Sequence, residues 1–512
     1  MQKRLPIVIF SLIVSSYTFA QTITEAVRYS SFDYASTARS IGVGGAFSSL
    51  GADMSAIAQN PAGLGEYRFG EFVFSAGAVI DNQKAVLAGQ STTKNTVSPS
   101  LGLIGYVSTN RHRSNSPISY SSFGISLNRF LTFENSFEYR ATTPGSIAER
   151  FVERANSLGL NDLDDFEAGP AFDAGAIYDF DGDNFYETDF GDFSSPVSRN
   201  QTVSRLGAGQ ELGLGYGANF NNKLSIGLNI GIPFFTFEET KTYREFDDSN
   251  SIDFFEDLEY VEYLETSGFG INAKIGGIYK INKRLRVSLA GHTPSVMILN
   301  DQFFADFTYT FNDNAIETIT ANSPNGEFEY RLTTPWRAIA GAAYMFTLGG
   351  DLIQRRNEED ADFAQRRKSQ TRGFISGEVE YVSYTNASFN LTANSNNPLD
   401  AQLEDALNNQ ISSDLKSIPI VKVGAEIAKA NLRYRAGVRY EPSVFQNGGT
   451  ANINFSGGLG IRINRVFVDL SGNFDSGESS YSPYFLTNSA SNQNVTVDQK
   501  KINIDLTFGL KL

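Results

Sequence analysis

The sequence predicts an all-β fold, namely a fourteen-stranded antiparallel transmembrane β-barrel with an N-terminal plug, or hatch, in its lumen. Three observations lead to this prediction. The N-terminus carries a secretory signal, apolar and polar residues alternate in segment after segment, and the 512 residues include 41 Phe, 23 Tyr and 46 Gly. Phe, Tyr and Gly suit strands and tight turns, whereas helical proteins use more Leu, Ala, Glu and Lys.

Residues 1–20 have the pattern of a signal peptide. A short basic start at 1–4 precedes an apolar stretch at 5–14, and small residues occupy the positions before a cleavage site at Ala20. We expect cleavage before Gln21. An uncleaved anchor is the alternative, but the apolar stretch is short for a bilayer core of about 30 Å. No later stretch is apolar enough for a transmembrane helix.

Residues 21–66 form the predicted plug, and residues 67–512 form the predicted barrel with long extracellular loops. The plug is rich in Ala, Gly and Ser and lacks sustained alternation. Small residues suit a segment that packs backbone against backbone inside a lumen. Gly42, Gly44 and Gly45 lack the spacing of a phosphate-binding loop, and no P-loop Lys follows them.

The C-terminus shows the strand pattern most clearly. Ile502, Ile504 and Leu506 lie on one face of an extended chain, and Asn503 and Asp505 lie on the other. The same pattern gives fourteen strand candidates, at 67–80, 100–109, 119–141, 202–220, 223–246, 258–282, 284–311, 327–347, 372–389, 418–429, 431–443, 451–463, 465–475 and 499–512.

The connections between these candidates alternate in length. Several even-numbered connections are tight turns, at 221–222, 283, 430 and 464. The odd-numbered ones are mostly long, at 81–99, 142–201, 247–257, 312–326, 390–417, 444–450 and 476–498. An even strand number with short turns on one side is typical of a transmembrane β-barrel. The charged connection 348–371 breaks the rule and is interpreted as a solvated excursion, and helices are expected at 145–158 and 398–416.

Three motifs carry a resemblance to a known family. Residues 51–64 read GADMSAIAQNPAGL, residues 334–341 read TPWRAIAG, and residues 433–440 read RYRAGVRY. The first run resembles the N-terminal hatch of the FadL/TodX outer-membrane transporters, with Asn60, Pro61 and Ala62 as the hatch motif. The two later runs are similar to later strands of that family.

The resemblance covers nearly the whole mature chain and implies a function. It implies a fourteen-stranded barrel plugged by its N-terminus, in the cell outer membrane of a Gram-negative bacterium. It also implies passive uptake of long-chain fatty acids or other hydrophobic compounds, which leave sideways where a wall strand is kinked. The third strand candidate, 119–141, would be the kinked one.

Arginines on one strand are the main candidates for ligand binding. Arg433, Arg435 and Arg439 share a face by period two, and arginine facing lipid would cost about 2–4 kcal/mol, so we expect them to face the lumen. Arg331 and His292 are further lumen candidates. An Arg could bind a ligand carboxylate. Alternatively, the arginines fill the interior as ion pairs with nearby acids, namely Glu378, Glu380 and Asp469.

A calcium candidate lies in the acidic loop 179–192. Asp179, Asp181, Asp183 and Glu187 offer oxygen ligands at alternate positions, as calcium sites do, although the glycine is misplaced for an EF-hand loop. An ordinary acidic surface loop is the alternative. No further metal site and no cofactor is expected.

Composition constrains the remaining function classes. The chain has no Cys, only two His and a net charge of −15, which argues against thiolate sites, multi-histidine metal centres and nucleic-acid partners. No catalytic constellation stands out, so we expect no enzyme; among enzymes, an outer-membrane phospholipase is the alternative. Among non-enzymes, a general or polar-solute porin and a heme receptor that uses His292 compete with the hydrophobic transporter. The expected partners of this monomer are a hydrophobic small molecule and outer-membrane lipid.

Overall fold

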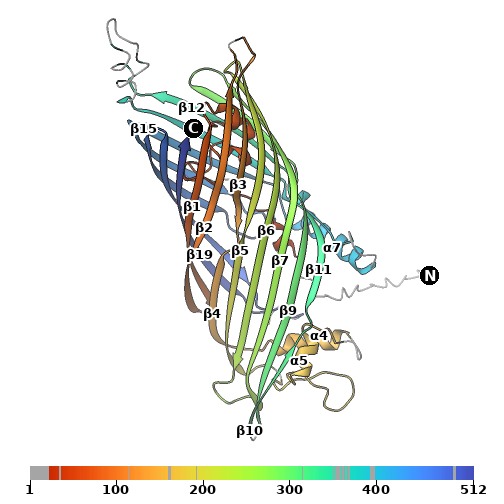
Figure 1. The fold of residues 1–512 in the computed structure, drawn as a ribbon. Helices are drawn as coiled ribbons and strands as arrows, with labels where there is room; N and C mark the ends of the chain where they lie inside the picture. Colours follow the sequence, from red (N-terminus) through yellow and green to blue (C-terminus); the bar gives the residue numbers. More distant parts are fainter. Residues whose placement is uncertain are drawn as a thin grey trace, which may run out of the picture.

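The computed structural model shows a closed antiparallel β-barrel with 14 wall strands (Figure 1). It describes residues 22–33, 36–113, 115–158, 163–191, 193–313, 315–349, 352, 359, 363, 366, 369–392, 398–487 and 492–512. The predicted signal peptide at 1–20 lies outside these residues, as does most of the predicted excursion at 348–371. None of the described helices combines the length and apolarity needed to span a membrane.

Helices occupy the N-terminal segment and several of the described connections between strands. The N-terminal segment contains α1 (Ile23–Arg28), α2 (Ala38–Ile41), α3 (Ala56–Gln59) and the 3-10 helix η1 (Pro61–Glu66). The loops contain α4 (Ala148–Leu158), α5 (Ala168–Asp173), η2 (Tyr384–Asn386) and α7 (Pro398–Asp414). The helices predicted at 145–158 and 398–416 are therefore confirmed.

Within the described residues, nineteen strands build the wall. The first nine are β1 (Glu71–Leu87), β2 (Gln90–Arg111), β3 (Ile118–Thr132), β4 (Asn135–Pro144), β5 (Pro196–Phe220), β6 (Leu224–Phe246), β7 (Phe254–Lys280), β8 (Leu285–His292) and β9 (Val296–Asp313). The others are β10 (Ala315–Asn322), β11 (Gly326–Thr333), β12 (Arg337–Thr347), β13 (Arg372–Val382), β14 (Ser388–Asn390), β15 (Ile418–Lys429), β16 (Leu432–Glu441), β17 (Asn452–Ile463), β18 (Val466–Tyr481) and β19 (Val495–Lys511).

Four wall positions are each occupied by two or three consecutive strand segments. The nineteen segments therefore form fourteen wall strands. β3 and β4 both pair with β5, and β8 and β9 both pair with β7. β10, β11 and β12 follow one another along β9 and β8, and β13 continues into β14. β1 pairs with β19 from Glu71↔Lys511 to Val86↔Thr496, which closes the barrel. The predicted fourteen-stranded barrel is confirmed.

The prediction of a long loop at 81–99 is wrong. β1 and β2 form one continuous hairpin that turns at Ala88 and Gly89, whose φ angles are 48° and 79°. Residues 90–98 are mostly Ser, Thr, Asn and Lys, so the strand carries no apolar face that would reveal it. Similarly, β18 continues to Tyr481 and β19 begins at Val495, so the connection predicted at 476–498 is shorter than expected.

The barrel is much taller on one side than on the other. β5, β6 and β7 have 25, 23 and 27 residues, whereas β13, β15 and β16 have 11, 12 and 10. The tall side ends beside α4 and α5, at the end of the barrel with long loops (Figure 1). We call this the long-loop end, and the opposite end, where the turns at Asn221, Ala430 and Asn464 lie, the short-turn end.

An apolar surface faces outward near the short-turn end. It includes exposed side chains from wall strands all around the barrel: Phe74, Ile104, Ile125, Leu214, Leu228, Ile271, Leu289, Val379, Val423, Tyr434, Leu459, Leu470 and Leu506. On β19, for example, exposed Leu506 and Phe508 alternate with buried Asp505 and Thr507. A closed barrel with an apolar outer surface fits a bacterial outer-membrane protein.

Candidate functional site

The described N-terminal residues, 22–33 and 36–66, are mostly buried against the inner face of the wall; we call them the plug. Its backbone and side chains contact inward-facing residues on opposite walls. The amide of Ala38 donates to Thr507 on β19, whereas the amide of Ser48 donates to Glu378 on β13 at 3.0 Å. The plug is therefore held between separate parts of the wall.

Wall glycines allow the plug backbone to approach closely. A Cβ added at Gly227 would lie 2.2 Å from the carbonyl carbon of Pro61, and one added at Gly437 would lie 2.2 Å from the amide nitrogen of Gly44. Both distances are far below van der Waals contact. Glycine is thus required at these wall positions for the plug to be seated.

The Asn60-Pro61-Ala62 motif forms the tightest part of this contact. Asn60 is extended, its side-chain oxygen accepts from the amide of Ala62 at 3.2 Å, and its amide group donates to the Ser48 carbonyl at 2.8 Å. Pro61 begins η1, where a missing N–H costs nothing. Gly276 on β7 leaves room for the Asn60 side chain.

Ion pairs join β12, β13 and β15 beside the plug. Lys422 donates to Glu378 at 3.0 Å and to Glu380 at 2.7 Å, and Arg337 contacts Glu380 at 2.7 Å. Gln59 of the plug also donates to Glu378, at 3.0 Å. All these groups are buried, so their mutual pairing offsets a large desolvation cost.

Arg435 faces the lumen but is fully enclosed. It contacts Glu426 at 2.7 Å and Asp469 at 2.9 Å, its side chain is 0% exposed, and the plug backbone at Gly42 packs against it. These contacts support the ion-pair interpretation more than the ligand-binding one.

The remaining candidates from the sequence lie in different environments. Arg439 pairs with Asp33 of the plug at 2.7 Å and lines a polar cavity of about 200 Å³ on the long-loop side of the plug. Arg433 is half-buried at the short-turn end. His292 is buried on β8, 2.9 Å from the Gln59 carbonyl.

The predicted placement of Arg331 in the lumen is wrong. Its neighbours on β11, Tyr330 and Leu332, are buried, so period two turns Arg331 outward, where it is exposed. The strand therefore presents its apolar residues to the lumen at this height and its charged residues to the outside.

An aromatic cluster lies between the plug and the long-loop end. Tyr29 of the plug stacks on Phe235 of β6 with ring centroids 4.8 Å apart, and Phe133 lies 5.9 Å from Tyr29 and 5.2 Å from Phe237. We call Tyr29, Phe133, Phe235 and Phe237 the aromatic cluster. Buried apolar residues extend it toward α7: Phe32, Phe130, Met297, Leu299, Leu332, Phe389, Leu407 and Ile411.

The sequence does not predict this cluster, because period-two alternation assigns the polar residues of each wall strand to the lumen. A signal was present. On β6, Phe234 faces outward and is 41% exposed, while Phe235 faces inward and is buried. Apolar residues on both faces of a wall strand indicate that the lumen is apolar at that height.

The third wall strand is broken beside the aromatic cluster. β3 ends at Thr132 and β4 begins at Asn135, and the register with β5 shifts near Arg129. Opposite the break, Gly207 has a φ of 112° and accepts a hydrogen bond from the amide of Phe133. A strand interruption at this position agrees with the kink implied by the family resemblance.

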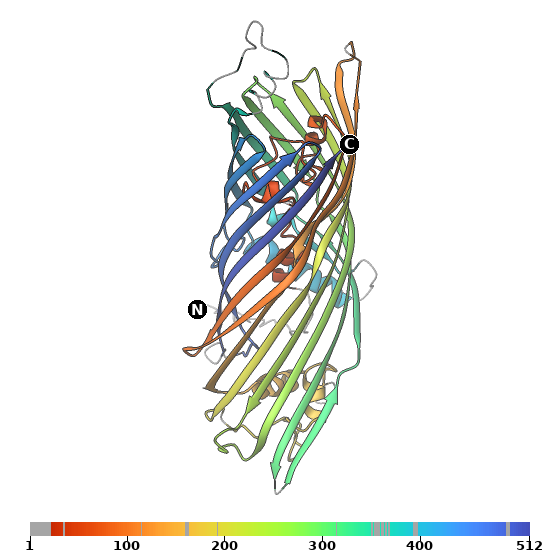
Figure 2. The same ribbon diagram turned by 60° about the vertical axis from the view of Figure 1, so that its left-hand side comes forward.

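The wall also loses its backbone pairing at this point. β2 pairs with β3 only from Leu103↔Asn128 to Arg111↔Tyr120. Among the described strand pairs, residues 90–101 of β2 pair with β1 alone, and β4 pairs with β5 alone. Figure 2 shows the β1–β2 hairpin, in orange, projecting from the barrel at this height. No hydrogen-bonded ladder is described between β2 and β4 here, although the two strands lie side by side.

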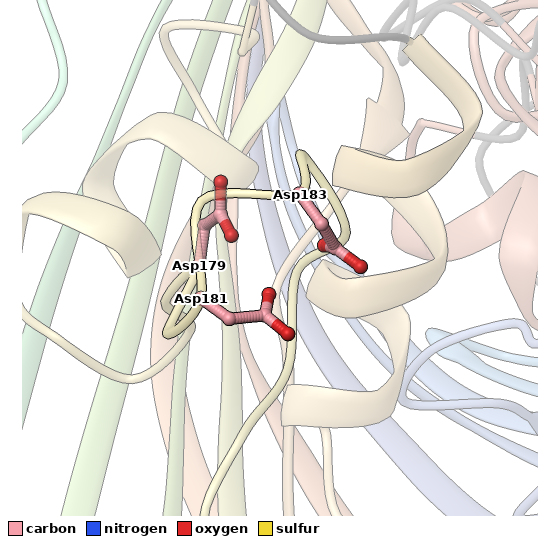
Figure 3. A group of neighbouring side chains, drawn as sticks. All are labelled: Asp179, Asp181 and Asp183. Carbon is pink, nitrogen blue, oxygen red and sulfur yellow. The ribbon is translucent and has the colours of Figure 1, made fainter.

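The acidic loop brings three of its four candidates together. Carboxylate oxygens of Asp179, Asp181 and Asp183 lie within 4.8 Å of one another (Figure 3), and Glu187 is outside this group. Asp179 already accepts hydrogen bonds from the amides of Gly182 and Asn184. Calcium binding stays a prediction from the sequence.

The long-loop end is closed by a second hydrophobic cluster that includes α4 and α5. Phe151 and Ala155 of α4 are buried in it. Near its edge, burial raises the pKa of the Asp189 carboxyl, although the Tyr309 and Tyr178 hydroxyls donate to it at 2.8 and 3.1 Å. We call this closure the lid, formed by residues 145–158, 168–173 and the wall residues they contact.

Comparison with solved structures identifies the fold. A FadL homologue of Pseudomonas aeruginosa matches with a TM-score of 0.52 and 10% identity over 93% of this chain and 98% of its own. The barrel has the fold of this FadL homologue. The toluene transporters TodX of P. putida and TbuX of Ralstonia pickettii are similar at 12% and 11% identity, with TM-scores of 0.49 and 0.47. They cover 94% and 93% of this chain and 99% and 98% of their own.

These similarities lie in structure and not in sequence. No protein-family model and no curated protein matches the sequence. The resemblance expected from the motifs is thus confirmed for the FadL-type fold, at low sequence identity.

Proposed function

We propose that this protein is a monomeric outer-membrane channel of a Gram-negative bacterium for the passive uptake of hydrophobic compounds, with long-chain fatty acids as the first candidates. One observation carries the proposal: the aromatic cluster lies directly at the break between β3 and β4. An apolar compound in the lumen would reach a part of the wall that no backbone ladder closes. The FadL-type fold supports the same function.

A path of this kind needs no catalytic group and no cofactor. The compound exchanges one apolar environment, the aromatic lumen, for another, the bilayer core. The plug contributes Tyr29 and Phe32 to the path, and it is joined to the breaking strand by a hydrogen bond from the Asp33 amide to the Phe130 carbonyl. Small movements of the plug would therefore shift the end of β3 at the break.

The proposal is tested by making the path polar. We expect Phe133→Asp and Phe235→Asp each to lower the uptake of radiolabelled oleate at least about tenfold, because an apolar solute would have to pass a buried carboxylate. Uptake is measured in cells that lack their own fatty-acid channel, with outer-membrane amounts matched by immunoblot.

Phe185→Asp is the matched control. Phe185 is 56% exposed in the acidic loop, so the same substitution adds the same charge away from the path. Normal uptake by a folded Phe133→Asp barrel would contradict the proposal. Equal uptake of oleate and a sugar of similar mass would instead favour the polar-solute porin.

A further inference from the structure

Two adjoining cavities lie beneath the plug at the short-turn end. The larger, of about 420 Å³, is bounded by Ala52 and Asp53 of the plug and by the ends of β13 and β15 to β19. The smaller, of about 270 Å³, shares Arg39, Ala52, Met345 and Phe374 with it. We call these two cavities together the vestibule.

The vestibule is cationic in an otherwise acidic protein. Its lining contains nine basic residues, Arg39, Arg68, Lys280, Arg286, Arg372, Arg433, Arg462, Arg465 and Lys511. It contains four acidic residues, Asp53, Glu66, Glu71 and Glu426. The chain as a whole has 57 acidic and 42 basic residues. The net charge of the lining is therefore opposite in sign to the net charge of the protein.

The acids present are shared between several cations. Glu66 contacts both Lys280, at 2.6 Å, and Arg286, at 3.4 Å. Glu426 contacts Arg39 at 3.4 Å and also Arg435 outside the vestibule. Glu66 and Glu426 therefore each serve two cations already. Arg462 of the lining pairs with Asp469, outside the vestibule, at 3.0 Å.

Two further arginines bring hydrogen-bond donors to the vestibule. The Arg433 guanidinium donates to the backbone carbonyls of Ala430 and Leu432, which carry no net charge. One terminal nitrogen of Arg68 is buried and has no hydrogen-bond partner among the described residues. Like charges beside a low-dielectric wall repel one another, and a bound anion relieves that repulsion.

The walls between these cations are apolar. Met345, Phe374, Val466 and Phe467 line the larger cavity, and the Arg462 guanidinium lies 4.1 Å from the Phe467 ring centroid. Phe374 and Phe467 are themselves buried, whereas Met345 is half-buried and Val466 is exposed. A free inorganic anion would leave Met345 and Val466 uncovered. A molecule with an anionic head and an apolar tail would match both parts of the lining.

We propose that the vestibule binds anionic amphiphiles, with a carboxylate or phosphate head at the arginines and the tail along Met345 and Val466. Guanidinium groups bind both kinds of head through paired hydrogen bonds. The amphiphile is either a free molecule or a bilayer lipid, since both carry this chemistry. The site lies on the opposite side of the plug from the aromatic cluster, so it does not depend on the proposed uptake path.

A single cysteine reports on this site, because the native chain contains none. Ala428→Cys places an environment-sensitive dye on the vestibule wall. The full-length protein is titrated with dodecanoate in phosphatidylcholine nanodiscs, with dodecanol and inorganic phosphate as comparison probes. We expect saturable binding of dodecanoate only.

Charge removal then locates the head group. In the labelled protein, the double variant Arg433→Gln/Arg465→Gln should weaken dodecanoate binding about tenfold or more, as loss of charge-assisted contacts predicts. The matched control is Arg111→Gln/Arg284→Gln, which removes two exposed arginines that do not line the vestibule. It should leave binding unchanged. Heat-shifted mobility in gels verifies that each barrel is folded.

The outcomes separate the possibilities. Three results would each overturn the proposal. The first is an equal response to dodecanoate and dodecanol, and the second is an equal loss of dodecanoate affinity in the Arg111→Gln/Arg284→Gln control. The third is binding of inorganic phosphate as tight as that of dodecanoate. Loss of the dodecanoate response in nanodiscs containing phosphatidylglycerol would support it with a lipid as occupant, and a persistent response would support it with a free amphiphile. Phe133→Asp should lower oleate uptake at least about tenfold yet leave vestibule binding intact, which distinguishes this site from the uptake path.

Discussion

The backbone amide of Asp33 donates to the carbonyl of Phe130 at 2.9 Å. This bond joins the plug to the third wall strand just before that strand is interrupted. The side chain of the same Asp33 pairs with Arg439 on β16, across the lumen. The plug is thus anchored both at the break in the wall and at the wall opposite, so its position and the break are coupled.

The first prediction concerns the seating of the plug. Gly227→Val should displace Pro61, because even a Cβ at this position would lie 2.2 Å from the Pro61 carbonyl carbon. We expect the barrel to fold and its single-channel conductance in planar bilayers to rise. Gly291→Val is the control, since a Cβ there meets nothing within 4 Å. Equal conductance of the two variants would contradict close seating.

Removal of the plug is the stronger form of this test. Deleting residues 22–66 exposes Glu378, Lys422 and Arg435, which now lie buried beneath it, to water. A solvated, charge-lined lumen should conduct ions, so the conductance should exceed that of the Gly227→Val variant. Unchanged conductance would show that the plug does not occlude the lumen.

The fold is largely predictable from the sequence, since alternation specifies a strand whenever one face meets lipid. The predicted ranges 418–429, 431–443 and 451–463 therefore agree closely with β15, β16 and β17. Residues 90–98 of β2 escape such a prediction because, beyond the apolar surface, nothing requires Ser and Thr to alternate with apolar residues. The aromatic cluster escapes it for a related reason: it depends on which strands are interrupted at which height, and only the assembled barrel shows that Phe133 and Tyr29 meet.

The arginines show a different limit of prediction from the sequence. Period two correctly places Arg435 and Arg439 on one face, but alternation does not reveal which acid each meets. Glu426 and Asp469 enclose Arg435 because β15 and β18 bring them to the same height, and the plug covers it. Register across several strands, combined with a separate segment, determines whether an arginine is available to a ligand.

Replacing Arg435 should therefore affect stability. Arg435→Ala removes one of two counter-charges from each of the buried carboxylates Glu426 and Asp469, which keep Arg39 and Arg462. Breaking a buried ion pair costs at most about 3–5 kcal/mol. We expect a lower temperature for the unfolding shift in gel mobility. Arg331→Ala, on the exposed outer face, is the control and should unfold like the native barrel. If Arg435→Ala instead keeps native stability and loses oleate affinity, the ligand-binding interpretation of this arginine is correct.

The last prediction concerns the lid. Arg199 on β5 is buried, and it donates to the carbonyl of Gly145 and to the Tyr484 hydroxyl, the latter at 2.9 Å. It also lies 3.6 Å from Glu245, which accepts from the amide of Ile147 just before α4. Arg199→Ala should release the start of α4, and loss of such a buried contact costs about 3–5 kcal/mol. We expect faster hydrogen exchange in α4 with unchanged exchange in β15 to β19. The matched control is Arg140→Ala, whose side chain is 68% exposed. Uniformly faster exchange throughout the barrel would mean that Arg199 stabilises the whole wall and not the lid alone.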